Sequence, residues 1–546
     1  MAFPPLLVSL LTSNDIPTHL DALHLVEVAH TLSGQIEDLM KIISVLQAEK
    51  EKCRIVLSPV RRIPQELLSE IFSFTLPYTL AEDDREMMTN LSAVCQSWRV
   101  AALATHTLWQ GVVLTPCLCF KYGATEIDYA HSEELEKVRT WMSRSGSLPK
   151  TVRYTRPSNA WPCQCIGGGD VRCEATHPTV MKLLSDGPPI DHFSLHVSST
   201  LCFRNWASLM QSLTGPNFAS SRWSNLRSFS LLFRDNNLQT WHDAVDPTRS
   251  IFALLPAVTT LRVYLPSRST AFYHDEDALE HRLLIPVKTL NQLTSLMLGW
   301  DWGGTKIADL LMHCSHLESL TIDFEHTDAF TGGEDEPIPE SLKISPLVLG
   351  RLEALHLRRG SVHILEYIRA PSLLRLEVEL NIWRPDCINT VKRIGAFIID
   401  SKIGGSLEYL RICKVVATQC QGPADLPLPP LSALRHLVLD SAAVTGYTFR
   451  SIGVDYEEHA AHPQFPSLTH LELLNMQRSE HTLRFELSYL QRRQYAPQCM
   501  VTVSYTNEVR LSEATLQDRL LTGRKSEITI RVFPAFSYDD NRVNDY

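Results

Sequence analysis

The sequence has no excess of basic residues and no long hydrophobic run. Its formal net charge is −10 over 546 residues, which argues against general nucleic-acid binding, because such binding requires a basic face. No apolar stretch approaches the roughly 18 to 20 residues needed to cross a bilayer. The apolar residues 6–11 have no basic residue before them, and Pro4 and Pro5 stand where a signal helix would begin. We therefore expect residues 1–19 to be an ordinary N-terminal segment rather than a secretory signal.

Common catalytic motifs are also missing. The chain has no Gly-x-Ser-x-Gly elbow, no Gly-x-x-x-x-Gly-Lys-Ser/Thr loop and no His-Glu-x-x-His pair, so it lacks the corresponding hydrolase, nucleotide-binding and zinc-protease signatures. One metal-like cluster exists, but its Cys-x-Cys spacing is tighter than the Cys-x₂-Cys of usual zinc sites. We expect an insertion loop there, no metal, no cofactor and no enzymatic activity. The cluster consists of Cys163, Cys165, Cys173 and His177.

The cysteines do not form a disulfide pattern. There are thirteen, an odd number, and most stand singly among apolar residues. This usage is typical of reduced, buried thiols rather than of a disulfide framework. It favours a location in the cytoplasm, the nucleus or both.

Residues 20–57 have a helical repeat. Apolar positions recur every three and four residues over more than four heptads, which is the spacing of a coiled-coil seam. Two interpretations stay open: a coiled-coil dimer, or a long helix that folds back on the rest of the chain. Ser58-Pro59 predicts the end of the helix, because the residue before proline is disfavoured in the α conformation. The seam consists of Leu25, Ala29, Leu32, Ile36, Leu39, Ile43, Leu46, Lys50, Cys53 and Leu57.

Residues 61–114 form a small module with three apolar clusters. Pro64 precedes a short amphipathic helix, a second helix carries Val-Cys-x-x-Trp, and Leu-Trp leads into a strand-like run at 112–114. An acidic insert at residues 77–89 separates the two helices, and we expect it to be a loop. About 50 residues is near the lower limit for an independently stable domain, so we expect the module to complete its core against a partner.

This module resembles an F-box. The family's pattern is a proline, an acid, two leucines and an Ile-Phe pair, then Val-Cys-x-x-Trp, then Leu-Trp. The sequence departs from it at Ile63, where the family usually has Leu, and in the long insert. The resemblance implies that the residues at these positions form the adaptor-binding module. Exposed members of the set Leu67, Leu68, Ile71, Phe72 and Leu108 would enter the partner's groove, while Trp98 and Val94 would fill the module's own core. The residues at these positions are Ile63, Pro64, Leu67, Leu68, Ile71, Phe72, Val94, Cys95, Trp98, Leu108 and Trp109.

The rest of the chain repeats the phrase Leu-x-x-Leu-x-Leu. Good copies begin at residues 226, 258, 293, 317, 352, 373, 407, 434 and 468, with a weaker copy at 190. The phrase resembles the strand of a leucine-rich repeat, although its intervals of 21 to 35 residues are longer and less even than the roughly 20 to 29 of regular repeats. Helical patterns recur between the phrases, and residues 500–505 and 528–532 resemble closing strands.

We therefore predict an α/β fold. It has an N-terminal coiled-coil-like helix, a small helical F-box, and an irregular leucine-rich-repeat-like α/β solenoid with a parallel sheet. A helix that ends before residue 147 and leads into the first repeat is similar to a connection found in fungal F-box proteins. The predicted segments are 1–19, the helix 20–57, the F-box 61–114, a helical linker 115–146, the repeat domain 147–506, and a C-terminal cap with an acidic tail 507–546.

In each repeat, the residues that flank the apolar positions point away from the core, because side chains alternate along a strand. A mixed-charge surface with Tyr and Arg suits protein recognition. The candidate substrate contacts are Arg262, Tyr264, His356, Arg358, Glu377, Glu379, Tyr409, Arg411, His436 and Asp440.

The resemblance implies a function without covalent chemistry. F-box proteins are generally substrate receptors of SCF-type cullin-RING ubiquitin ligases, in which the F-box binds a Skp-family adaptor and the C-terminal domain holds the substrate. Such a receptor acts by raising effective concentration. The expected partners are the adaptor, the cullin and an unknown protein substrate. The alternative is a scaffolding protein that uses the coiled coil and the solenoid outside a ligase. An enzyme is a third hypothesis that no motif supports.

Overall fold

The chain divides into two compact units. The first unit contains Met1–Thr75 and Met87–Thr105, and the second contains Leu76–Glu86 and His106–Tyr546. The computed structural model describes residues 5–13, 16–115, 127–155, 163, 173–214, 225–233, 246, 248–266, 283–299, 304–324, 340–360, 362–380, 387–413, 428–440, 465–476, 499–505 and 528–533. Within these ranges, no helix combines the length and the apolar character needed to cross a membrane.

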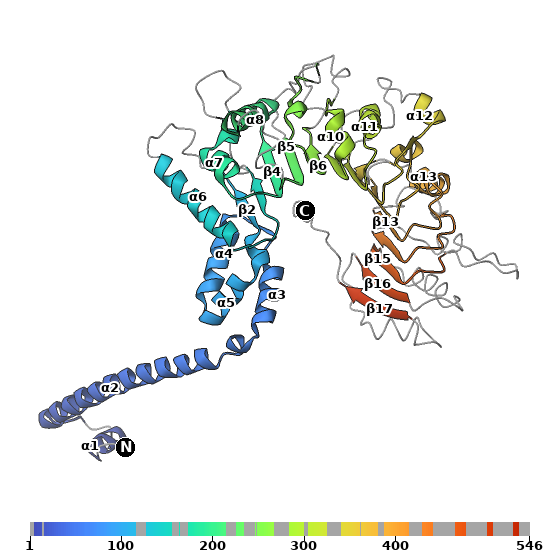
Figure 1. Cartoon of the computed structure of the whole chain (residues 1–546). Helices are drawn as coiled ribbons and strands as arrows, with labels where there is room; N and C mark the ends of the chain where they lie inside the picture. The colour runs from blue at the N-terminus through green and yellow to red at the C-terminus, as the bar shows by residue number, and fades with distance from the viewer. Residues whose placement is uncertain are drawn as a thin grey trace, which may run out of the picture. The chain divides into compact units, whose positions relative to one another are not determined.

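The first unit is helical. A capping box begins its longest helix: the Asp21 N–H donates to the Thr18 hydroxyl over 3.3 Å, and the Asp21 carboxylate accepts from the Thr18 N–H over 3.1 Å. This helix ends immediately before Ser58-Pro59, as predicted. It is the long helix labelled α2 in Figure 1. The helices are α1 Pro5–Ser13, α2 His19–Leu57, α3 Gln65–Thr75 and α5 Gln96–Ala104, while α4 Glu82–Ala93 lies partly in each unit.

The prediction of a long N-terminal helix is confirmed, since α2 has 39 residues. In the described structure none of these residues is buried. No second copy of the chain is present to test whether α2 forms a coiled coil, and this pairing stays a prediction.

The second unit is built on one large parallel sheet. In the described residues fifteen strands follow one another in chain order, and each neighbouring pair is parallel. The strands are β1 Thr79–Leu80, β2 Gly111–Leu114, β3 Thr151–Tyr154, β4 His192–Val197, β5 Ser228–Phe233, β6 Thr260–Tyr264, β7 Ser295–Gly299, β8 Ser319–Asp323, β10 Ala354–Gly360, β12 Arg375–Leu380, β13 Tyr409–Cys413, β14 His436–Asp440, β15 His470–Met476, β16 Cys499–Tyr505 and β17 Ile528–Phe533.

All nine good copies of the repeated phrase fall on strands, from β5 to β15, so the predicted parallel sheet is confirmed. A separate two-stranded sheet pairs β9 Leu347–Val348 with β11 Ile368–Arg369. The large sheet extends beyond the predicted range 147–506 at both ends, because β1 and β2 precede it and β17 follows it. The predicted acidic tail after residue 533 lies outside the described residues.

Helices lie along one side of this sheet (Figure 1). Because consecutive parallel strands need a crossover connection, a helix between strands is the expected solution. The helices of this unit are α6 Ile127–Ser143, α7 Pro178–Asp186, α8 Thr200–Thr214, α10 Val287–Gln292, α11 Gly304–Leu311, α12 Glu340–Ile344 and α13 Cys387–Asp400.

A row of buried leucines, which we term the leucine ladder, runs through the core of the second unit. Each ladder residue lies directly beside the next in the strand register, and each is at most 1% exposed. At roughly 1.5–3 kcal/mol for each fully buried side chain, this row is a large part of what joins strand to strand. The ladder consists of Leu261, Leu296, Leu320, Leu355, Leu376, Leu410, Leu437 and Leu471.

The prediction of a loop at residues 77–89 is wrong. These residues form β1 and most of α4, and β1 pairs with β2 at the edge of the sheet. The acidic residues Glu82, Asp83 and Asp84 occupy the first turn of α4, where negative charge is stabilised by the helix dipole. The Asp84 carboxylate also accepts from the Ala81 N–H over 2.9 Å. The acidic run is therefore a helix start.

Close packing of β1 on β2 requires glycine at position 111. A Cβ on Gly111 would lie 2.7 Å from both the Tyr78 carbonyl oxygen and the Thr79 Cγ2 atom. We expect Gly111→Ala to lower the free energy of unfolding by about 1–3 kcal/mol, because the crowded atoms include backbone. Thermal unfolding followed by circular dichroism measures the change.

Gly34 in α2 offers the matched control, since a Cβ there meets no atom within 4 Å. Gly34→Ala should leave the melting temperature unchanged or raise it, because alanine favours a helix by about 0.5–1 kcal/mol over glycine. Equal melting of the Gly111→Ala variant and the wild-type protein would contradict the packing argument.

Candidate functional site

The first candidate site is the surface of α3. Leu68 and Phe72 are each 1% exposed, and the Phe72 ring meets the Trp98 ring of α5 edge-on at 5.3 Å. Since α3 and α5 pack together through these side chains, Leu68 and Phe72 belong to the module's own core. Leu68 and Phe72 are therefore not among the exposed members of the predicted adaptor-binding set. Trp98 is half-buried.

A neighbouring face of α3 is apolar and open to solvent. Leu67, Ile71 and Phe74 are 50%, 45% and 90% exposed, and their spacing of four and three residues places them on one helical face. We term this set the apolar stripe. Phe74 was not predicted, although it continues the helical spacing from Leu67 and Ile71. Surface patches of this kind mark interaction sites.

Val94 does not fill the core as predicted. It lies between α4 and α5 and is 55% exposed, because the chain turns there and Cys95 begins α5 as its N-terminal cap residue. Of the other predicted adaptor contacts, Pro64 is exposed, and Ile63 and Cys95 are half-buried.

Leu108 and Trp109 belong to the second unit. Both are buried in the short helix His106–Trp109. The Trp109 ring packs against Trp141 of α6 at 4.4 Å, and the Arg144 guanidinium carbon lies 4.5 Å from its centroid. These residues pack at the start of the sheet and present almost no free surface, because Leu108 is 4% and Trp109 is 2% exposed.

The second candidate site is the face of the large sheet opposite the leucine ladder, which we term the polar face. All ten predicted substrate contacts lie on it, since each occupies a strand position that alternates with ladder residues. Nine of them are half-buried, and only Asp440 is buried.

An ion-pair network holds the centre of this face. The Glu377 carboxylate lies 3.4 Å from the His356 Nε2 atom, 3.6 Å from the Arg411 NH1 atom and 2.7 Å from the Arg375 Nε atom. Burial alone would raise the pKa of Glu377, but His356 and Arg375 outweigh it and lower the pKa to about 2. Glu377 is therefore a fixed negative charge between β10 and β13.

Asp440 fixes the next part of the network. Its carboxylate lies 3.2 Å from the Arg411 NH2 atom and accepts from the Asn475 side-chain amide over 2.8 Å. Arg411 on β13 thus lies between Glu377 on β12 and Asp440 on β14 and pairs with both. Because Asp440 is only 5% exposed, its role is to orient these neighbours.

Asp323 has the corresponding role on β8. It is 1% exposed and accepts two hydrogen bonds from Arg359, of 2.8 and 2.6 Å. The Arg358 guanidinium lies 3.9 Å from Asp323 and 3.8 Å from Glu379. The predicted residues Arg358 and Glu379 therefore meet on the polar face.

Aromatic and histidine rings continue the face toward β15. The Arg375 guanidinium carbon lies 4.0 Å from the Tyr409 ring centroid, and the Tyr409 ring meets His436 at 4.9 Å. The His436 Nε2 atom is 2.8 Å from the Glu472 carboxylate, and this contact is the main cause that lowers the pKa of Glu472. Tyr and Arg side chains in such an array suit protein contacts.

Arg262 and Tyr264 extend the face on β6. The Tyr264 hydroxyl donates to the Met297 sulfur over 3.3 Å, and burial, followed by the charge of Asp323, raises the pKa of Tyr264 to about 12. Burial also lowers the pKa of Arg262. The structure thus assembles all ten predicted residues on one surface, although their charges are largely paired with one another.

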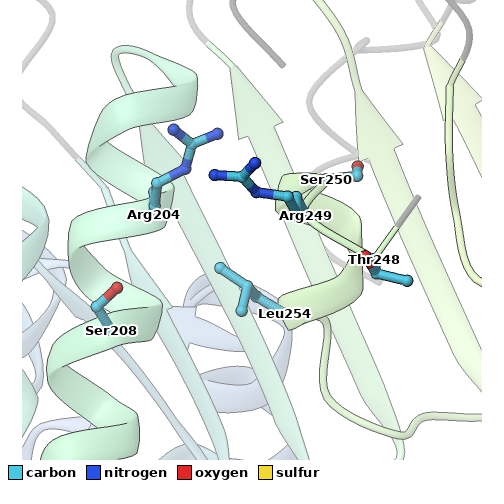
Figure 2. A pocket seen from close by; sticks show the side chains of 6 residues that line it. All are labelled: Arg204, Ser208, Thr248, Arg249, Ser250 and Leu254. Atoms are coloured by element: carbon cyan, nitrogen blue, oxygen red, sulfur yellow. The ribbon is translucent and has the colours of Figure 1, made fainter. Parts of the chain in front are cut away.

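A shallow cavity of about 390 Å³ lies beside α8. Figure 2 shows the guanidinium groups of Arg204 and Arg249 turned toward the same space above Leu254. Among the described residues that line it, none is a carboxylate, a histidine or a cysteine, so this lining offers no acid-base or nucleophilic pair. The lining residues are Arg204, Ser208, Thr248, Arg249, Ser250 and Leu254.

The cysteines that the structure brings together differ from the set that the sequence spacing suggested. Cys165 lies outside the described residues, and His177 is buried as the residue that precedes α7. Cys163 and Cys173 come together with Cys202 of α8, a residue that the spacing argument did not include. No short-range motif could have indicated Cys202, because it joins the cluster only through the fold.

Comparison with known families identifies the segment that contains the first site. Residues 60–115 match the family model described as F-box-like, so the chain contains an F-box-like domain that includes α3, α4, α5 and β2. No curated protein matches the chain, and the expected likeness to fungal F-box proteins stays a prediction.

The network around Glu377 predicts a pH dependence of stability. Because the folded state lowers the pKa of Glu377 from 4.5 to about 2, its contribution is present above pH 4.5 and is lost as the pH falls toward 2. Glu377→Gln should therefore lower the melting temperature most at neutral pH, and the difference from wild type should shrink steadily below pH 4.5. Thermal unfolding at a series of pH values measures this.

Glu353→Gln is the matched control, since Glu353 precedes β10 and its side chain is exposed. It should melt like the wild type at every pH. A Glu377→Gln variant whose deficit is independent of pH between 7 and 3 would contradict the assigned charge interaction.

Proposed function

We propose that this protein is a non-catalytic substrate-recognition subunit of an SCF-type cullin-RING ubiquitin ligase. The observation that carries the proposal is the F-box-like match at residues 60–115 together with the exposed apolar stripe on its first helix. F-box domains bind Skp-family adaptors in SCF complexes. The chain would join such an adaptor at one end and hold a protein substrate at the other.

The adaptor would bind the apolar stripe. Leu67 and Ile71 are half-exposed and Phe74 almost fully so, whereas Leu68, Phe72 and Trp98 hold α3 against α5. A rigid helix with one apolar face is suited to insertion into a hydrophobic groove. Val94 lies exposed before α5 and is the natural second contact.

The second unit would be the substrate receptor, and we propose that it is a leucine-rich-repeat-like solenoid. Support comes from the sequential order of its parallel strands and from the in-register leucine ladder, because in a solenoid each repeat packs only on its neighbours. The substrate would bind the polar face. There, half-buried Arg, Tyr and His side chains are held by ion pairs, which reduces the entropy lost on binding.

The alternative function is a scaffold outside a ligase. It makes a different prediction about complexes in cells: the scaffold would purify without a cullin, while the receptor would purify with both the adaptor and the cullin. Affinity purification of the full chain followed by mass spectrometry separates the two.

Adaptor binding should depend on the apolar stripe and leave folding unaffected. We expect Leu67→Asp with Ile71→Asp to weaken binding of a purified Skp-family adaptor more than about 100-fold, because each lost apolar contact is worth roughly 1.5–3 kcal/mol. Isothermal titration calorimetry with the full chain measures the affinity, and circular dichroism checks the fold.

Ile399→Asp is the matched control, since Ile399 is 63% exposed on α13 in the second unit. It should bind the adaptor like the wild type. If the double variant bound as tightly as the wild type while folded, the proposed docking surface would be wrong.

We further propose that α2 forms a coiled-coil dimer. None of its residues is buried in the described structure, which favours pairing over folding back, because exposed Leu and Ile at seam positions gain by burial. Ile43 lies on the seam and Val45 lies off it, with 52% and 61% of their surfaces exposed. The pair therefore offers a direct comparison of seam and non-seam positions.

We expect the wild-type chain to elute as a dimer, Ile43→Glu to shift it toward the monomer, and Val45→Glu to leave it dimeric. Multi-angle light scattering after size exclusion gives the mass. A monomeric wild type across the micromolar range would exclude the dimer.

A further inference from the structure

Three buried cysteines lie close together in the second unit. Their sulfur atoms are all within 4.8 Å of one another, and the Cys163 and Cys173 sulfurs are 4.0 Å apart. The three side chains are 2–5% exposed. They come from different places: Cys163 follows β3, Cys173 precedes the short helix Glu174–Thr176, and Cys202 lies in the first turn of α8.

These distances fit a single bound metal ion. Three atoms within 4.8 Å of one another can all be reached from one point about 2.8 Å away. The Zn–S bond is about 2.3 Å long, so side-chain movements of about half an ångström would complete the site. Thiolates are soft ligands that select zinc over calcium or magnesium.

The surroundings of Cys202 offer its sulfur a hydrogen-bond donor. The Ser199 hydroxyl accepts from the Cys202 N–H and can donate to the Cys202 sulfur, each over 3.2 Å. Cys202 also stands at the positive end of the α8 helix dipole, where a negative sulfur is stabilised. Such a hydrogen bond from a neighbouring side chain is typical of the outer shell of a metal site.

Tyr154 completes the wall of the cluster without competing as a ligand. Its hydroxyl donates to the Glu174 carbonyl oxygen over 2.5 Å. This hydrogen bond holds the Tyr154 hydroxyl on a backbone oxygen, so the donors of the cluster are its three sulfur atoms.

We propose that Cys163, Cys173 and Cys202 bind one zinc ion that has a structural role. The ion ties Cys163 and the described segment that begins at Cys173 to α8, the helix that follows β4. Three protein ligands leave one tetrahedral position for water or another side chain. A disulfide would use only two of the sulfurs and would not account for the third.

The experiment uses the full chain, purified under reducing conditions from zinc-supplemented cells without a histidine tag. Elemental analysis should find about one zinc ion per chain in the wild type and about tenfold less in Cys202→Ala. Cys314→Ala is the matched control, since Cys314 is also 2% exposed but its sulfur contacts the Leu310 carbonyl oxygen outside the cluster. It should keep its zinc.

Two further measurements guard against a variant that simply unfolds. A strong chelator should lower the melting temperature of the wild type and of Cys314→Ala, but not that of Cys202→Ala. Cobalt added to the stripped wild type should give the near-ultraviolet absorption of thiolate ligation. Wild-type protein without zinc, zinc retained by Cys202→Ala, or cobalt binding without thiolate absorption would each overturn the proposal.

Discussion

The leucine ladder is the constraint on which the second unit depends. Each strand of the large sheet from β6 to β15 places a leucine directly beside the leucine of its neighbour. Because each leucine needs only the strands on either side, the segments between strands can differ in length without disturbing the core. The spacing between repeated phrases varies from 21 to 35 residues, yet the strand register stays continuous from Leu261 to Leu471.

The ladder also organises the polar face. Once the inward positions are fixed, the alternating positions of successive strands must lie side by side, and His356, Glu377 and Arg411 come into register as cross-strand neighbours. Their charges are paired where solvent is partly excluded. Burial penalises such charges unless they are well paired, so the pairing keeps the charged form of Glu377 stable and also holds these side chains in place. Side chains held in this way suit the protein recognition that we propose, because they need little rearrangement on binding.

The F-box-like domain does not form a separate module in this chain. Its helices α3 and α5 belong to the first unit, whereas Leu108, Trp109 and β2 belong to the second, where Trp109 packs on α6. The insert that looked like an interruption supplies β1 and the start of α4. A small module short of core residues was expected to complete its core against a partner, and part of its sequence contributes to the sheet of its own chain.

Sequence periodicity alone determined the long helix α2, the parallel strands and the two faces of the sheet, because apolar spacing reports directly on which side of an element is buried. Periodicity could not tell which of several adjacent apolar residues is buried and which is exposed. Leu67 and Leu68 are adjacent and chemically equal, but only the packing of α3 on Trp98 buries one and exposes the other. Periodicity also could not predict contacts between segments that are far apart in the sequence. Asp440 meets Arg411 and Asn475, and Cys202 meets Cys163, only because the fold brings their strands and helices together.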